Sequence, residues 1–127
     1  MVIAASGILL KDKKILLIKR SDYTTIYPNY WACPGGRAEN NETPEMTVMR
    51  EVKEEVNLDF IPTQLFTTAT WQDRDLYRYL GNWQGKIKIQ EEEVTNYGWF
   101  SYMETKKLAL AFDYARVIEL LNKKELL

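Results

Sequence analysis

The sequence predicts an α+β domain in which a mixed β-sheet lies between helices. Its 127 residues suffice for one ordinary domain and leave little room for another, so we expect a single domain over residues 1–127. Hydrophobic residues make up 46% of the chain and charged residues 28%, as in globular proteins with a proper core. Strand-like runs dominate, with one helix predicted in the middle of the chain and one at its end. This order of elements is typical of α+β or layered α/β/α architectures.

The N-terminal region predicts a β-hairpin followed by a loop. Two β-rich runs, residues 2–10 and 15–19, are separated by the polar turn KDKK. Residues 21–29, SDYTTIYPN, are polar and aromatic and predict a loop. A sharp backbone turn is then expected at Pro34-Gly35-Gly36.

A helix is predicted from Thr43 to about Asn57. Thr43 can cap its start, and Pro44 suits the first turn, where a missing N–H costs nothing. Glu45 places a favourable negative charge near the positive end of the helix dipole. Asn57 should end the helix, because asparagine tolerates the left-handed conformation that commonly follows the last turn.

The second half of the chain predicts strands and then a helix. Residues 64–100 are strand-like in the runs LFTTATWQ, DLYRYLGNW, KIKIQ and YGWF. The segment FDYARVIELLNKKELL carries Ala115, Ile118 and Leu121 at helical spacing, which predicts a C-terminal amphipathic helix.

Composition excludes several functions. The net charge of −1 provides no basic field, so we expect neither a nucleic-acid nor a membrane partner, and any anionic ligand must be captured locally. The chain has no histidine, which excludes histidine general bases, Ser-His-Asp triads and histidine-ligated zinc. Acid–base work would therefore fall to carboxylates, lysine or tyrosine.

The expected compartment is the cytoplasm. Cys33 is the single cysteine and cannot form an internal disulfide, which argues for a reducing compartment. The apolar N-terminal stretch is interrupted by lysines and is too short to span a bilayer.

The predicted middle helix carries the acidic run REVKEE, residues 50–55. An α-helix turns about 100° per residue, so Glu51, Glu54 and Glu55 share one face. Four apolar residues fall roughly opposite, on the side that would pack onto a sheet: Met46, Met49, Val52 and Val56.

Two interpretations of this run compete. A solvated face of charges is the ordinary one, since like charges one turn apart cost only about a few tenths of a kcal/mol. Against it, no lysine compensates the pair Glu51–Glu55, a Gly-Gly turn precedes the helix, and the chain has no other plausible catalytic cluster. Converging carboxylates suit a hard cation such as Mg²⁺ or Mn²⁺, which would relieve the repulsion.

At these residues the sequence resembles the Nudix box, G-x5-E-x7-R-E-U-x-E-E-x-G-U. Gly36, Glu42 and the segment from Arg50 to Leu58 meet every fixed position except one, where Asn57 stands in place of glycine. The approach WACPGG and the downstream segment EVTNYGWF are also similar to the family, so the likeness covers nearly the whole chain. Because asparagine is the next best residue for a left-handed turn, we expect no lost ligand.

The resemblance implies a Nudix hydrolase of α/β/α sandwich form that cleaves a nucleoside diphosphate linked to another group X. Mg²⁺ or Mn²⁺ would be the cofactor. By matching box positions, the metal ligands would be the carbonyl of Gly36 and the carboxylates of Glu51, Glu54 and Glu55. Glu93, in the downstream segment, matches the position of an additional acidic ligand or base in the family. The implied catalytic residues are Glu51, Glu54, Arg50 and Glu93. Glu51 or a neighbour would help to activate water, Arg50 would orient Glu51, and Glu42 would support the loop or the outer metal shell.

Six residues are candidates for substrate binding. Arg20 and Arg37 could neutralise phosphates, although either could equally be a bland surface arginine. An aromatic ring could stack a base, although aromatic residues in strands more often belong to the core; the candidates are Tyr30, Trp71 and Tyr77. Glu39, in the approach to the box, completes the set.

We expect hydrolysis of a nucleoside di- or triphosphate, of the MutT-like kind, because the chain is compact. ADP-ribose, nucleotide-sugar or dinucleoside polyphosphate hydrolysis remains an alternative, because the box handles phosphates and the surrounding loops choose the rest. A nucleotide sensor that does not cleave is a third hypothesis, against which all the box glutamates count. The expected partner is a small nucleotide, and a homodimer is left open.

Overall fold

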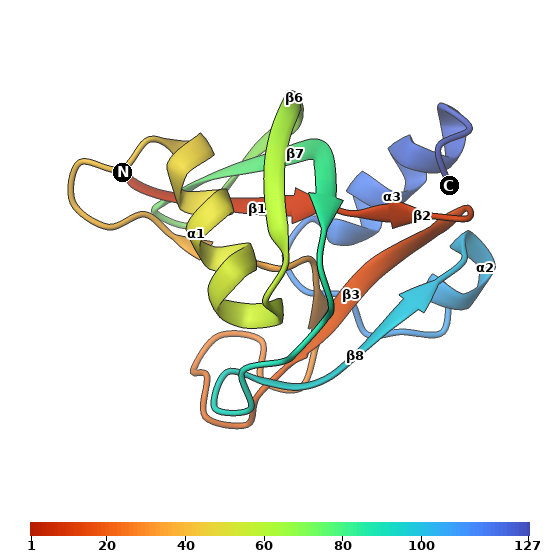
Figure 1. The fold of residues 1–127 in the computed structure, drawn as a ribbon, viewed down its shortest axis with the longest axis horizontal. Helices are drawn as coiled ribbons and strands as arrows, with labels where there is room; N and C mark the ends of the chain where they lie inside the picture. Colours follow the sequence, from red (N-terminus) through yellow and green to blue (C-terminus); the bar gives the residue numbers. More distant parts are fainter. The chain divides into compact units, whose positions relative to one another are not determined.

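The protein is described here by a computed structural model of residues 1–127, with eight strands and three helices (Figure 1). The chain forms two compact units. The first unit comprises Met1–Leu9 and Pro34–Ile89, and the second comprises Leu10–Cys33 and Gln90–Leu127. The predicted α+β class is confirmed, since each unit combines a sheet with helix. The prediction of one domain over residues 1–127 stays a prediction.

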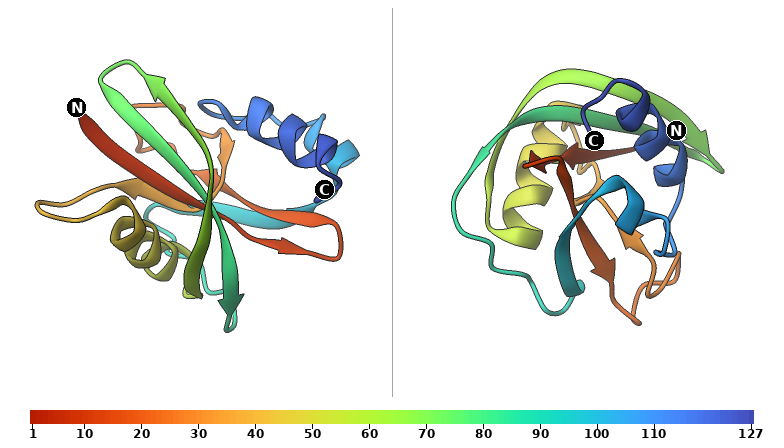
Figure 2. Two further views of the ribbon diagram at one scale, coloured as in Figure 1. Left: turned by 90° about the horizontal axis from the view of Figure 1, so that it is seen from above. Right: turned by 90° about the vertical axis from the view of Figure 1, so that its right-hand side faces the viewer.

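The first unit contains a mixed four-stranded sheet in the order β5-β1-β7-β6 and one helix, α1. β1 runs parallel to β7, and the other two pairings are antiparallel. β6 and β7 lie side by side as a long hairpin (Figure 2). The bounds are β1 (Val2–Ile8), β5 (Gly35–Arg37), α1 (Pro44–Val56), β6 (Asp59–Trp71) and β7 (Arg74–Gln84).

The register defines two faces of this sheet. One face carries Gly36 and Tyr79, and α1 covers it, because Glu51 approaches Gly36 and Glu45 is hydrogen-bonded to Tyr79. The opposite face carries Ser6 and Arg78, which are both buried and joined by a hydrogen bond of 3.1 Å from Arg78 Nη1 to Ser6 Oγ.

β6 is the edge strand of the first sheet, with a neighbour on one side only. Its pairing with β7 shifts register between Pro62 and Gln64 and again between Leu65 and Thr67. Proline lacks the N–H that a central strand needs, so its presence suits an edge. The strand begins at Asp59, five residues before the predicted strand-like segment.

The second unit contains a sheet in which β3 pairs with β2, β4 and β8, together with two helices. In α3, Tyr114, Val117, Ile118 and Leu121 are buried, which confirms the predicted C-terminal helix, whereas Ala115 of the predicted apolar face is exposed. The short α2 was not predicted; Ser101 and Glu104 form a capping box at its start. The bounds are β2 (Leu10–Lys11), β3 (Lys14–Arg20), β4 (Trp31–Ala32), β8 (Val94–Phe100), α2 (Tyr102–Thr105) and α3 (Tyr114–Lys123).

The predicted N-terminal hairpin has a different first strand. Residues 2–8 join the first sheet, and the hairpin is formed by β2 and β3, with Leu10 opposite Ile15. Asp12 and Lys13 both have positive φ, at 51° and 62°, as the two-residue turns of hairpins require. The turn was therefore located correctly, but the apolar run before it belongs to two strands.

Two further expectations are wrong. Residues 86–90, KIKIQ, form no strand, because alternation shows which side chains could face a core and cannot supply a partner strand. Met46 and Met49 do not pack onto the sheet, since they are 49% and 40% exposed; Val48 is fully buried in their place, beside Val52 and Val56. The packing face of α1 is thus rotated toward the glutamates.

None of the three helices has the length and apolar composition needed to cross a bilayer.

Candidate metal and phosphate site

The site is built on α1 and on the loop that leads into it. Thr43 caps the helix as predicted, its Oγ1 accepting a hydrogen bond of 3.2 Å from the N–H of Met46, and Pro44 occupies the first turn. Asn57 ends the helix with φ 64° and ψ 25°, which confirms the predicted left-handed residue. Its Nδ2 donates to the carbonyl of Lys86 at 3.3 Å, a bond that glycine would not make.

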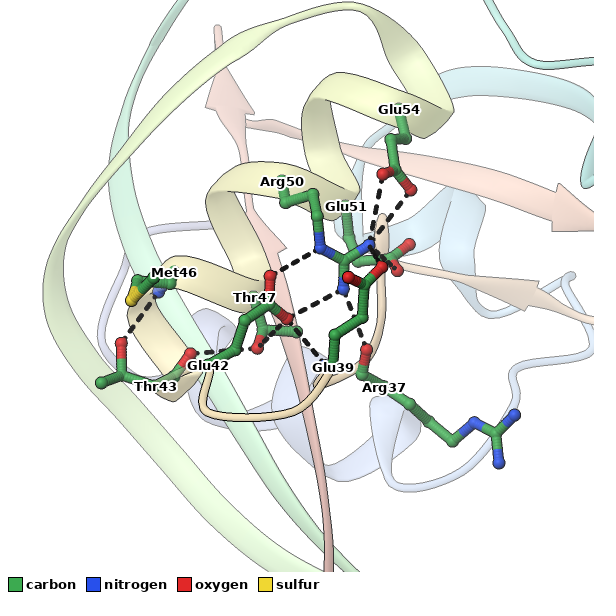
Figure 3. Close-up of polar contacts among 9 residues, drawn as sticks. All are labelled: Arg37, Glu39, Glu42, Thr43, Met46, Thr47, Arg50, Glu51 and Glu54. Atoms are coloured by element: carbon green, nitrogen blue, oxygen red, sulfur yellow. Dashed lines mark hydrogen bonds and ion pairs between the residues drawn. The ribbon is translucent and has the colours of Figure 1, made fainter.

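Arg50 is the centre of the polar cluster in this unit (Figure 3). Nε and Nη2 donate to the two oxygens of Glu42 at 2.6 and 2.9 Å, a bidentate pairing. Nη1 donates to Glu51 Oε1 at 2.8 Å and to Glu54 at 3.2 Å, and it lies 3.4 Å from Glu39. Nη2 also donates to the carbonyl of Arg37 at 3.1 Å. One guanidinium therefore holds four carboxylates and the strand before the loop.

Glu42 ties the loop to the helix. Besides the Arg50 fork, its Oε1 accepts the N–H of Glu39 at 2.9 Å and the hydroxyl of Thr47 at 3.0 Å. The hydrogen bonds from Arg50 and then from the Glu39 N–H lower the pKa of Glu42 to about 2, against its usual 4.5. The same bond to Glu42 raises the pKa of Arg50 above its usual value. Both groups are charged at every pH at which the protein would work.

The three box glutamates differ in burial. The side chain of Glu51 is 13% exposed and that of Glu54 is 50% exposed, whereas Glu55 is buried at 7%. The N–H of Gly35 donates to Glu55 Oε1 at 2.7 Å. Carboxylate oxygens of Glu51 and Glu55 lie within 4.8 Å of one another. Two carboxylates this close and this shielded fit a hard divalent cation, which takes oxygen ligands.

Gly35 and Gly36 lie in the strand β5 and not in a sharp turn as predicted. Gly36 allows α1 to approach the sheet closely, and Gly35 allows β5 to approach β1. A Cβ on Gly36 would lie 2.6 Å from Cδ of Glu51, and a Cβ on Gly35 would lie 2.3 Å from the carbonyl oxygen of Ala5. Only glycine leaves the Gly36 backbone and the Glu51 carboxylate in direct contact. This contact brings the predicted carbonyl ligand beside a predicted carboxylate ligand.

A groove of about 410 Å³ opens beside this cluster. Its lining residues are Val2, Arg37, Ala38, Glu39, Arg50 and Glu51. The groove therefore joins the carboxylates that Arg50 holds to the exposed side chain of Arg37, which points away from them (Figure 3).

Two predicted substrate residues on the first sheet have neighbours that sequence reasoning did not identify. Trp71 lies at the end of β6, with the Arg74 guanidinium 5.7 Å from its ring centroid. Tyr77 lies on the same sheet face as Tyr79, the face that α1 covers. Their proposed stacking on a base stays a prediction, as does the role of the exposed Glu39.

The other predicted residues lie in the second unit. Arg20 donates to the carbonyl of Ile26 and lies 5.4 Å from the ring centroid of Phe112. Tyr30 packs edge-on against Tyr27, with ring centroids 5.0 Å apart. Glu93 is exposed in the turn before β8. Its use as a metal ligand or base stays a prediction.

Two arginines were missed. Arg74 and Arg78 lie on the β7 face opposite α1, where Arg78 is buried beside Ser6. The alternation of RDLYRYL would have placed both arginines and Leu76 on one face. Neither arginine belongs to a motif, so no signal beyond this alternation marks them.

The chain is similar in sequence to a known family and to curated proteins. The NUDIX domain family model matches residues 1–121. An ADP-ribose pyrophosphatase of Methanocaldococcus jannaschii is 42% identical over 73 residues, which are 58% of this chain and 42% of that protein. An 8-oxo-dGTP diphosphatase of Proteus vulgaris is 31% identical over 65 residues, 51% of this chain and 58% of that protein. The chain thus spans about half the length of these curated relatives.

A solved structure supports the fold. The crystal structure of a MutT NUDIX hydrolase from Burkholderia pseudomallei superposes with a TM-score of 0.83 at 21% identity, covering 93% of this chain and 95% of that one. At this identity the likeness concerns the fold.

Proposed function

Since this chain belongs to the Nudix hydrolase family, we propose that it hydrolyses the pyrophosphate linkage of a nucleoside di- or triphosphate derivative with a divalent metal. The observation that carries the proposal is the set of carboxylates held by Arg50 beside Gly36. A solvated charged face would not need a buried glutamate bonded to a strand N–H, or a bidentate arginine between loop and helix.

The oxygen donors of this set suit Mg²⁺ or Mn²⁺. A metal bound there would neutralise charge on the phosphate oxygens and lower the pKa of a bound water. We assign Glu51, Glu54, Glu55 and the Gly36 carbonyl to metal binding. Arg50 keeps the Glu51 carboxylate turned toward Gly36, and Glu42 balances the charge of Arg50.

The proton of the attacking water needs an acceptor. The chain has no histidine, and we propose a carboxylate beside the metal as the base. Glu51 is our first candidate because Arg50 and Gly36 hold its position. Glu93 is proposed as a further ligand or as an alternative base.

The test is a panel of nucleotide substrates with Mg²⁺ and with Mn²⁺, scored for released phosphate or pyrophosphate. Glu54→Gln should retain the fold and lose at least about tenfold in rate. The matched control is Glu92→Gln, which removes one charge from the exposed acidic turn and should retain the full rate. Binding of nucleotides without turnover of any substrate would favour the sensor hypothesis.

A second candidate activity is hydrolysis of ADP-ribose. It is favoured by the relative from Methanocaldococcus jannaschii, whereas the relative from Proteus vulgaris favours nucleoside triphosphates. The same panel separates the two through the ratio of kcat/KM for ADP-ribose and for triphosphates.

The finer predictions concern assembly and compartment. We retain the cytoplasmic location and the open question of a homodimer as predictions. Size-exclusion chromatography with light scattering would give the oligomeric state directly.

A further inference from the structure

Two arginines of the first unit lie on one face of its sheet, on either side of β1. In the register, Ala4 is opposite Arg37 on β5, and Val2 is opposite Arg74 on β7. Paired residues point to the same face, and so do residues two apart along a strand. Arg37 and Arg74 therefore share the face that α1 does not cover. Their strands are two strand spacings apart, about 10 Å, within reach of two long side chains.

Trp71 holds one member of this pair in place. It is opposite Arg74 in the β6–β7 register, and the guanidinium of Arg74 lies 5.7 Å from its ring centroid. A cation over a tryptophan face is stabilised by the ring quadrupole. Arg74 is thereby kept on the sheet face rather than extended into water.

The two arginines repel each other. Burial first, and then the charge of Arg37, lower the pKa of Arg74, while Asp73 offsets part of the effect. Two like charges beside each other on a sheet face are an unfavourable arrangement unless an anion completes it.

Arg37 is the member of the pair that lines the groove beside the proposed metal site. Arg37 and Val2 line the groove of about 410 Å³ that also contains Arg50 and Glu51, and Val2 is paired with Arg74 in the sheet. The exposed guanidinium of Arg37 points away from the carboxylates that Arg50 holds (Figure 3). A substrate that extends along this groove from the carboxylates would therefore place its far end near Arg37.

We propose that Arg37 and Arg74 form an anion subsite for the part of the substrate that extends beyond the metal-bound phosphates. This inference rests on the proposed function, and it assigns a substrate class: nucleotides whose group X itself carries phosphate. Trp71 is a positioning residue for Arg74. A nucleotide sugar with an uncharged X would gain nothing from the subsite.

The kinetic test compares two substrates of one nucleobase, a nucleoside tetraphosphate and a nucleotide sugar. Arg37→Gln and Arg74→Gln should each raise KM for the tetraphosphate about 5- to 10-fold and leave KM for the nucleotide sugar unchanged. Arg74→Lys, which keeps the charge, should recover most of the loss. The control Lys86→Gln removes an exposed positive charge of the same unit and should change neither KM.

A binding test does not depend on turnover. Inorganic tripolyphosphate is titrated calorimetrically into the protein in EDTA, with thermal melts to establish that each variant is folded. The wild type should bind, and the variant with both arginines replaced by glutamine should bind at least tenfold more weakly. Binding that depends on both arginines, without hydrolysis of any nucleotide, would support the subsite and refute the proposed function. Turnover with equal KM changes for both substrates, or tripolyphosphate binding that the double variant retains, would overturn the subsite.

Discussion

The acidic run of α1 and the acidic turn at residues 91–93 each bring three glutamates close together in the sequence, but the two regions differ in structure. In α1, Arg50 binds Glu51 and Glu54, and the strand N–H of Gly35 binds Glu55. In the turn, all three glutamates are exposed, and the backbone of the segment makes its hydrogen bonds. Density of charge alone therefore does not fix the position of carboxylates. What distinguishes α1 is a cation and a glycine backbone that fix where its carboxylates lie.

The largest effect is expected when Arg50 is replaced. Arg50→Gln leaves Glu42, Glu51 and Glu54 without their shared partner, so we expect a 10- to 100-fold loss of activity. The free energy of unfolding should fall by roughly 2 kcal/mol, between the values for an exposed and a buried ion pair. Urea unfolding and steady-state kinetics measure both effects.

Lys53→Gln is the matched control, since Lys53 lies on the same helix as Arg50 and forms an exposed ion pair of 3.2 Å with Asp59 at the start of β6. It should change stability by less than about 0.5 kcal/mol. Equal effects of the two substitutions would mean that Arg50 is another surface charge.

Substitutions at the two adjacent glycines should have different effects, one mainly on stability and the other mainly on activity. Gly35→Ala forces a Cβ against the backbone of Ala5 and should cost about 2–3 kcal/mol of stability. Gly36→Ala meets the carboxylate of Glu51, which can move, so stability should fall by less than about 1 kcal/mol. Activity and Mn²⁺ affinity should nevertheless fall about tenfold, because the ligand is displaced.

Thermal melts and Mn²⁺ titration of both glycine variants check this separation. A Gly36→Ala protein with wild-type activity would show that the position of Glu51 is not critical.

The dependence of stability on acid pH tests how much the ionised Glu42 carboxylate contributes to the free energy of unfolding. Its pKa in the folded protein, about 2, lies below the usual 4.5, so the unfolded chain takes up a proton first. The stability that Glu42 contributes is therefore complete above about pH 4.5 and is lost as the pH falls from 4.5 to about 2.

Urea unfolding of the wild type and of Glu42→Gln at pH 7, 4.5, 3 and 2 measures the stability that Glu42 contributes. The difference between the two proteins should shrink through that window. A difference that stays constant with pH would assign the pairing energy to other groups.

Asn57→Gly should have the smallest effect. Glycine relieves the left-handed backbone, whereas the bond from Asn57 Nδ2 to the Lys86 carbonyl is lost, so the two terms oppose each other. We expect a change in unfolding free energy within about 0.5 kcal/mol and unchanged metal affinity, measured by urea unfolding and Mn²⁺ titration. A large change in activity would mean that this end of the helix takes part in the site.

Local signals in the sequence predicted local structure well. The bounds of α1 follow from Thr43, Pro44 and Asn57, whose effects act within one helical turn. The face shared by the box glutamates follows from helix geometry alone. These features needed no knowledge of the rest of the chain.

Contacts between distant residues could not be predicted in this way. The bond from Gly35 to Glu55 joins residues twenty apart, and the Glu42–Arg50 fork depends on the loop conformation. Strand partners were also missed, because the apolar run of residues 2–10 looks the same whether it forms one strand or two. The buried face of α1 was predicted incorrectly because Met46 and Met49 are as apolar as the valines. Apolar character alone could not show that the valines would be buried and the methionines exposed.

The edge strand β6 has a consequence for the behaviour of the protein at high concentration. From Phe60 to Trp71 it carries no charged side chain, and an uncharged free edge can add a strand from a second molecule. Pro62 and the two register shifts interrupt this edge in its first half, while Thr67–Trp71 remains regular. The first half of the strand therefore resists pairing with a second molecule. At high protein concentration, such pairing would be expected at the regular second half.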